Sequence, residues 1–146
     1  MSTKHLEILE TTVQKTHQWI ESLAEEAHMD SHTAYQALRA VLQTLRDRLP
    51  PAEAAHFAAQ LPLLIRGIFY EGYRPSQTPE GLCRQEFLDR VAEKIVTGRV
   101  VDPLEAAEQV FSLLERFMGH GELEKVGRVL PPELRSLFPE RTGGWC

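Results

Sequence analysis

The chain has 146 residues, 42% of them hydrophobic and 25% charged, which are ordinary values for a single globular domain. Its 21 acidic and 16 basic side chains give a formal net charge of −5, and this balance argues against nucleic-acid binding, which needs clustered Lys and Arg. No apolar run approaches the roughly 18 residues of a membrane-spanning helix, and the first residues lack the apolar core of a signal peptide. We therefore expect one cytoplasmic domain over residues 1–146, without a nucleic-acid or membrane partner.

Helical spacing of apolar residues predicts four helices in the first half of the chain. The first spans about 3–27, and a loop at 28–32 follows it. Thr33 is the expected N-cap of the second helix. Pro51 suits the first turn of a third helix, where its missing N–H is no loss, and Pro62 ends that helix and can open a short fourth one.

Four more helices are expected in the second half of the chain. Residues 78–80 (Thr-Pro-Glu) signal the start of the fifth helix, although Gly81 can delay it, and Gly98 closes this helix. Residues 102–103 (Asp-Pro) start the sixth, as a cap followed by a proline at the first helical position. The turn at 119–121 separates it from a seventh helix, and an eighth spans 131–138. Alternation with a period of two never lasts long enough to predict a strand.

One sequence pattern occurs twice along the chain. Residues 61–69 and 130–138 share a Leu-Pro start, a central Arg and a final Phe, at an offset of 69 residues (130 − 61). At the same offset, Leu45 matches Leu114. Self-similarity of this kind is the sequence signature of a repeat architecture. Because each repeat holds only short helices, which are marginal alone, we expect the two to pack around one core.

The expected fold class is therefore all-α: a compact helical bundle built from two pseudo-symmetric repeats of about four helices each. The first repeat covers about 15–70 and the second about 82–138. A joint at 71–79 connects them, and the tail at 139–146 has no partner pattern, so we expect it to fray. Eight apolar positions of the two repeats should be buried together: Leu45, Leu61, Ile65, Phe69, Leu114, Leu130, Leu134 and Phe138.

Several segments together resemble domain-of-unknown-function family 2267. They are residues 45–56 (LRDRLPPAEAAH), 60–62, 66–67, 70–75 (YEGYRP), 86–91 and 130–138. The resemblance covers roughly 15–138, and Tyr73 stands where the family usually has Trp. It implies a small, all-helical, soluble bacterial protein. It implies no activity, because none is attached to the family.

Metal-ligating residues are few and scattered. His28 and His32, with Asp30 between them, have the i, i+4 spacing of two ligands on a helix, but they fall in a predicted loop where this spacing loses its meaning. Two Glu-x-x-His pairs, at 25–28 and 53–56, are typical of di-metal sites in ferritin-like bundles, yet the second repeat has no matching pair. Structural roles or solvated helix faces explain these residues better than a metal site does, because such a site needs three or four converging ligands. We therefore expect no metal and no cofactor.

The two cysteines are Cys83, between the repeats, and Cys146, at the last position. Their places favour free thiols in a reducing cytosol over a disulfide. Cys83 lies near a helix start, where a thiol can become a nucleophile, but the sequence offers neither an oxyanion loop nor an orienting group beside it. The sequence therefore identifies no catalytic residue and favours a non-enzymatic protein.

The joint contains the candidate interaction residues Tyr70, Tyr73 and Arg74. They lie where the chain departs from its own repeat, and Tyr and Arg are favoured at binding hot spots. A simpler interpretation is that both tyrosines pack the joint onto the core and Arg74 pairs with a carboxylate. The sequence favours an interaction module that binds a protein partner or its own copy. A small-ligand protein or enzyme with a site in the groove between the repeats is the alternative.

Overall fold

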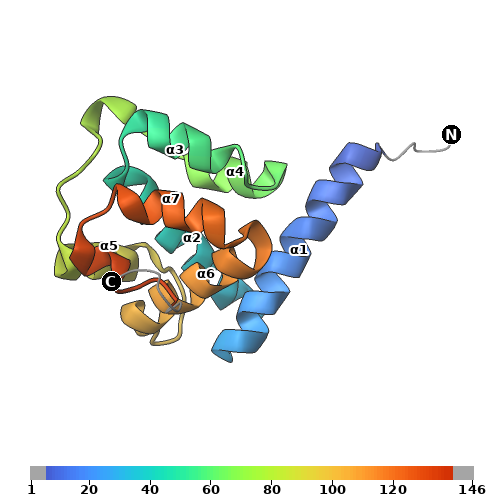
Figure 1. Ribbon diagram of the computed structural model, residues 1–146. Helices are drawn as coiled ribbons and strands as arrows, with labels where there is room; N and C mark the ends of the chain where they lie inside the picture. Colours follow the sequence, from blue (N-terminus) through green and yellow to red (C-terminus); the bar gives the residue numbers. More distant parts are fainter. Residues whose placement is uncertain (1–5, 140–146) are drawn as a thin grey trace, which may run out of the picture.

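The computed structural model describes residues 6–139, and this part of the chain is helical without a strand (Figure 1). The predicted all-α class is therefore confirmed. The helices are α1 (Glu7–Ala27), α2 (Ser31–Arg48), α3 (Pro51–Ala58), α4 (Leu63–Tyr70), α5 (Arg84–Lys94), α6 (Pro103–Met118), α7 (His120–Arg128) and α8 (Pro132–Arg135), with a short 3₁₀ helix, η1 (Pro75–Gln77), in the joint. Over residues 6–139, each helix is too short or too polar to cross a lipid bilayer.

Helix α2 is the central helix of the bundle and packs against α1, α4, α5 and α6. Three small residues, Ala34, Ala37 and Ala40, are fully buried along it and permit the close approach of its neighbours. Its second half is buried on all sides, so that even Gln43 and Arg46 are inside. Buried polar groups need hydrogen-bond partners, and those of α2 therefore determine how the neighbouring segments are held.

All eight core positions expected from the sequence are buried, and they belong to one hydrophobic cluster. The prediction of a shared core is confirmed at these positions. Aromatic rings fill the cluster: Phe111 stacks on Phe138 with ring centres 4.3 Å apart, and Phe57 lies 5.5 Å from Phe69. The first pair joins α6 to the segment that follows α8, and the second joins α3 to α4.

The turn between α1 and α2 differs from the prediction in its cap. Thr33 is not the N-cap of α2, because the carboxylate of Asp30 accepts the backbone N–H of Thr33 at 2.7 Å and caps the helix. His32 consequently lies in α2 rather than in a loop. The buried hydroxyl of Thr33 instead forms a hydrogen bond of 3.1 Å with the hydroxyl of Thr97. His28 ends α1 in the left-handed conformation, at φ 55°.

The Asp30 cap predicts a pH-dependent contribution to stability. Its hydrogen bonds from Thr33 hold the pKa of the Asp30 carboxyl below its usual range. Because the folded pKa is lowered, this stabilisation is present at pH values above the unfolded pKa, about 3.9, and is lost as the pH falls through the folded pKa. We expect Asp30→Ala to melt below the wild type at pH 7, and this difference should shrink towards pH 3.

Thermal unfolding of the wild type, Asp30→Ala and Asp30→Asn at both pH values checks this prediction. Asn is a good N-cap without a charge, so Asp30→Asn should be the nearly pH-independent control in this comparison. Equal melting temperatures of the wild type and Asp30→Ala at pH 7 would show that the cap contributes nothing.

Helix α5 begins later and ends earlier than the sequence predicts. Residues 78–80 do not start it, because the backbone N–H of Glu80 donates to the carbonyl of Asp47 at 2.7 Å and holds this segment outside the helix. The helix starts after Cys83, whose N–H donates to the Glu86 carboxylate at 3.1 Å. At its other end α5 stops at Lys94 rather than near Gly98, and the Lys94 carbonyl accepts a hydrogen bond from Arg39 at 3.0 Å.

Three other helix starts follow the expected signals, whereas α1 begins at Glu7 instead of near residue 3 and α8 covers only Pro132–Arg135 of the expected 131–138. Pro51 occupies the first turn of α3, and Pro62 precedes α4 as its N-cap residue. Asp102 caps α6 by accepting the N–H of Leu104 at 3.1 Å. The tail expected at 139–146, including Cys146, lies outside the described residues apart from Pro139.

Candidate functional site

The joint residues predicted as an interaction site are divided between core and solvent. Tyr70 and Tyr73 are half-buried against the core, and their rings lie 5.7 Å apart. The guanidinium of Arg46 lies over the Tyr73 ring at 5.3 Å from its centre. Arg74 is exposed, and its side chain forms no hydrogen bond or ion pair with another residue in 6–139. The geometry therefore gives the tyrosines a packing role and does not supply the carboxylate partner that the simpler interpretation assigned to Arg74.

Arg46 is the residue that holds the joint, and it is only 3% exposed. It donates to the carbonyls of Phe69 at 2.9 Å and Glu71 at 2.7 Å, and to the Asp47 carboxylate at 2.9 Å. Gln43, one turn earlier on α2, donates to the carbonyl of Ile68 at 2.9 Å. These carbonyls lie at the C-terminal end of α4, where a helix leaves its last acceptors without intrahelical partners. Arg46 and Gln43 thus cap α4 from a neighbouring helix.

The same polar network continues to α5. Arg90 forms an ion pair of 3.0 Å with Glu80 and lies 3.9 Å from Asp47. The hydrogen bond from Arg90 to Glu80 raises the pKa of Arg90. Burial, together with the nearby Arg46 guanidinium, lowers the pKa of Lys94, whose ammonium donates to Gln43 at 3.2 Å. Because these charges and amides contact one another, the network is a clamp between α2, the joint and α5.

Sequence reasoning did not identify this clamp, although a signal was present. Gln43 and Arg46 lie three residues apart on α2, next to Leu42 and Leu45 of its apolar stripe. A polar side chain at a core position is informative because burial without a partner costs free energy. Such residues indicate hydrogen-bond partners outside their own helix, which here are carbonyls at the C-terminal end of α4.

The packing of the joint leads to a prediction that separates Tyr73 from Arg74. We expect Tyr73→Ala to lower the free energy of unfolding by about 1–3 kcal/mol, because it removes a half-buried ring under Arg46. Tyr73→Phe should be close to neutral, since the Tyr73 hydroxyl is buried without a partner within residues 6–139. Arg74→Ala should also be close to neutral. Urea unfolding of the three variants checks the order, and a large loss for Arg74→Ala would contradict it.

The candidate metal ligands are not assembled into a site. Among residues 6–139, no three side chains of His, Cys, Asp or Glu lie close enough together to hold a metal ion. His28 and His32 belong to different segments, and Asp30 between them pairs with Arg99 at 3.3 Å. The Glu-x-x-His pairs, Glu25 with His28 and Glu53 with His56, do not come together. Cys83 is an exposed free thiol at the start of α5.

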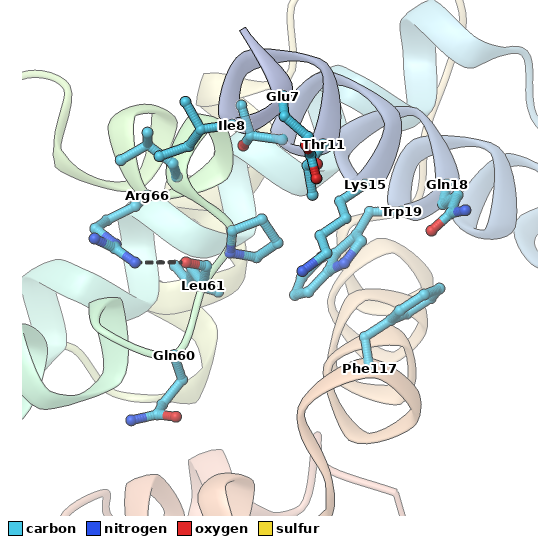
Figure 2. Close-up of a pocket in the computed structure, with 13 residues that line it drawn as sticks. Glu7, Ile8, Thr11, Lys15, Gln18, Trp19, Gln60, Leu61, Arg66 and Phe117 are labelled. Carbon is cyan, nitrogen blue, oxygen red and sulfur yellow. Dashed lines mark hydrogen bonds between the residues drawn. The ribbon is translucent and has the colours of Figure 1, made fainter.

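A groove of about 700 Å³ lies beside the N-terminal half of α1. Figure 2 shows Trp19 and Phe117 on one side of it and Leu61 and Arg66 on the other. Trp19 is 3% exposed and stacks on Phe117, with ring centres 5.2 Å apart, whereas Phe117 is 42% exposed. Ile8 of α1 is 65% exposed at the upper edge. The groove is therefore lined with apolar surface, and solvent reaches part of it.

The groove exists because α1 is longer than the helices that cover it. The N-terminal half of α1 extends past the body of the bundle towards the upper right of Figure 1. Its contact with α4 includes a hydrogen bond of 2.9 Å from the Leu64 N–H to the hydroxyl of Thr12. This bond satisfies one of the unpaired N–H groups at the start of α4. The wall formed by α4 is thereby attached to the wall formed by α1.

A second hollow lies between α3 and α7 and has a volume of about 550 Å³. It is lined by His56 and Glu53 of α3 and by Lys125 and Arg128 of α7. Lys125 pairs with Glu122 at 3.4 Å and Arg128 with Glu124 at 2.9 Å, so both cations already have carboxylate partners. This hollow lies between the two halves of the chain, but its two cations form their ion pairs within α7.

The fold and its hollows define a small all-α protein with a clamped joint and an open apolar groove. A family model described as "Uncharacterized conserved protein (DUF2267)" matches residues 16–137. The chain belongs to this family, which agrees with the resemblance of its joint and repeat segments. A search of proteins with curated descriptions found no match to the chain.

Proposed function

We propose that this protein is a non-enzymatic helical interaction module that binds a segment of a partner protein in the groove beside α1. The observation that carries the proposal is the distribution of exposed apolar side chains. Nine large ones are exposed among residues 6–139, and three of them, Ile8, Leu63 and Phe117, line the groove. Four more lie next to it in the chain but outside its lining: Leu6, Leu9 and Val13 at the first part of α1, and Leu64 at the start of α4. Gathered apolar exposure marks interaction sites more often than single exposed residues do.

The groove supports a protein partner better than an enzymatic role. Its charged lining consists of Glu7, Lys15 and Arg66, without a histidine or cysteine that could act as a base or nucleophile. Arg66 already donates to the carbonyls of Ala58 and Leu61, both at 3.0 Å, so it caps α3. An open apolar surface with a few fixed polar groups fits the anatomy of a protein interface.

The joint remains the second candidate surface. Arg74 is exposed there and unpaired within residues 6–139, while Tyr70 and Tyr73 keep part of their surface accessible. Arg and Tyr at such a place favour protein recognition. The groove is preferred because the nine exposed large apolar residues include none from the joint.

We also propose that the bundle consists of two pseudo-symmetric repeats that function as one cytoplasmic domain. The order of the helices supports this: the four helices α1–α4 precede the joint and the four helices α5–α8 follow it. Matched positions such as Leu45 and Leu114 are both fully buried. The exposed free thiol of Cys83 supports a reducing compartment. Superposition of 19–69 on 87–138 in an experimental structure is the test of the repeat.

A pair of matched double variants tests the groove as a binding surface. Ile8→Ser with Leu63→Ser removes two exposed apolar side chains from the groove, and Val96→Ser with Val100→Ser removes two that are at least as exposed elsewhere. Each protein is immobilised on a column and exposed to native lysate. We expect the wild type and the control to capture the same partner protein. The groove variant should lose it while its melting temperature stays within the range of the control.

Retention of that partner by a folded groove variant would contradict the proposal. If Arg74→Ala alone lost the partner, the result would show that the partner binds at the joint and not in the groove. Because every variant changes exposed residues, stability and binding can be measured on the same preparation.

A further inference from the structure

The walls of the groove indicate how a partner segment would bind. Ile8 of α1 and Leu63 at the start of α4 line it, and the hydrogen bond between Leu64 and Thr12 joins these two helices. Phe117 of α6 lies next to Trp19 on the side of the groove across from Ile8 and Arg66 (Figure 2). The exposed apolar side chains of the lining therefore come from three helices, α1, α4 and α6. An amphipathic helix that inserts its apolar face between helices is a common mode of peptide recognition.

Two other modes of peptide recognition are disfavoured. Addition of a partner strand needs a free sheet edge, and residues 6–139 contain no strand. Proline-rich ligands bind grooves lined with several exposed aromatic rings, whereas in the described part of the chain this groove exposes only Phe117, since Trp19 is almost fully covered and stacks on it. A helix remains as the form of occupant that fits these walls.

The charge of the groove is opposite in sign to that of the protein. The chain carries a net charge of −5, but Lys15 and Arg66 line the groove against the single carboxylate of Glu7. Lys15 is exposed and forms no ion pair within residues 6–139. Arg66 is held in position by the carbonyls that it caps. Two cations near an apolar surface favour an approaching segment with carboxylates beside its apolar side chains.

We propose that the groove binds an acidic amphipathic helix of a partner protein, with the apolar stripe of that helix on Ile8, Leu63 and Phe117. Acidic side chains along one flank of this helix meet Lys15 and Arg66. The inference rests on the proposed function and adds the chemical class of the partner. Charge complementarity of this kind mainly selects the partner and speeds its association, while the apolar contacts supply most of the affinity.

A second copy of the chain is a weaker occupant. The outer side of α1 carries Leu9 and Val13 next to Glu10, so α1 could enter the groove of another copy. This stripe and the groove lie on different sides of the same helix. Such a contact would be head-to-tail, which generates open chains unless the rotation closes a ring. A foreign partner satisfies the groove without that consequence.

Two synthetic peptides test the inference directly. Both carry the same apolar stripe at helical spacing, and one has Glu while the other has Lys at the same flanking positions. Fluorescence anisotropy at low salt measures their affinities for the wild type, Lys15→Glu and the matched control Lys125→Glu. We expect the Glu peptide to bind the wild type and the control at least about tenfold more tightly than the Lys peptide, and Lys15→Glu to abolish or reverse this preference.

Each other outcome overturns the inference in a recognisable way. Equal binding of both peptides would exclude the charge rule, and binding of neither would exclude the helical occupant. If the lysate partner still depends on Ile8 and Leu63 in either case, the interaction module survives without its acidic helix. If that dependence is also absent, the proposed function fails as well. Growth of the wild type into larger species with concentration, measured by sedimentation, would identify a second copy as the occupant.

Discussion

Replacement of Arg46 by alanine is expected to lower the free energy of unfolding by about 3–5 kcal/mol, the cost of removing one partner of a buried ion pair. The side chain is 3% exposed and contacts three acceptors: the Asp47 carboxylate and the carbonyls of Phe69 and Glu71. Its loss would leave the Asp47 carboxylate with only the ion pair to Arg90 at 3.9 Å, and it would uncap the C-terminal end of α4. Tyr73 would also lose the guanidinium over its ring.

Urea unfolding of Arg46→Ala, Arg46→Lys and Arg74→Ala measures this effect. Arg46→Lys should recover little of the loss, because an ammonium cannot reproduce the planar fork that reaches two carbonyls and a carboxylate together. Arg74→Ala removes the same charge from an exposed position and should change stability by less than about 0.5 kcal/mol. If Arg46→Ala and Arg74→Ala had the same urea midpoint, the clamp would contribute nothing to the stability of the fold.

Leu134→Ala and Leu114→Ala are expected to cost about 2–5 kcal/mol each, the range for leucines in a packed core. Leu114 is fully buried on α6, and Leu134 is 1% exposed on α8. Leu134 is the one buried residue of the four-residue helix α8, and it therefore attaches this helix to the cluster. A chemical-denaturation midpoint measures both losses, with Val100→Ala as the control because Val100 is fully exposed. Unchanged midpoints for both leucine variants would mean that the buried face has been assigned wrongly.

The two predictions concern different ways of holding the same bundle. The leucines stabilise it through apolar burial, which depends on volume and tolerates modest rearrangement. Arg46 acts through hydrogen bonds with defined directions, and it connects the centre of the bundle to the joint. A partner that binds beside α1 would leave both sets of contacts in place. Loss of binding without loss of stability is consequently the signature that distinguishes groove variants from core variants.

Local sequence determined most of the helices and much of the core. The apolar stripe of α2 and the prolines at Pro51, Pro62 and Pro103 act on their own segment, and the structure keeps each of them where local rules place it. Burial of Leu45 and Leu114 follows equally from spacing, since an apolar stripe on a short helix has to be covered by another element. The family resemblance depends on the same segments and agrees with the family match.

The tertiary structure decided the partner of Thr33, the cap of α4 and the groove. The hydroxyl of Thr33 forms a hydrogen bond with Thr97, which lies far along the chain, whereas the Asp30 cap of α2 is a contact between near neighbours. Arg46 could have remained in solvent on an isolated helix, and only the position of α4 makes it a cap. The groove likewise requires α1 to extend past α4 and Phe117. Periodicity and turn signals report interactions between near neighbours, whereas these features depend on contacts between residues distant in sequence, which no local pattern encodes.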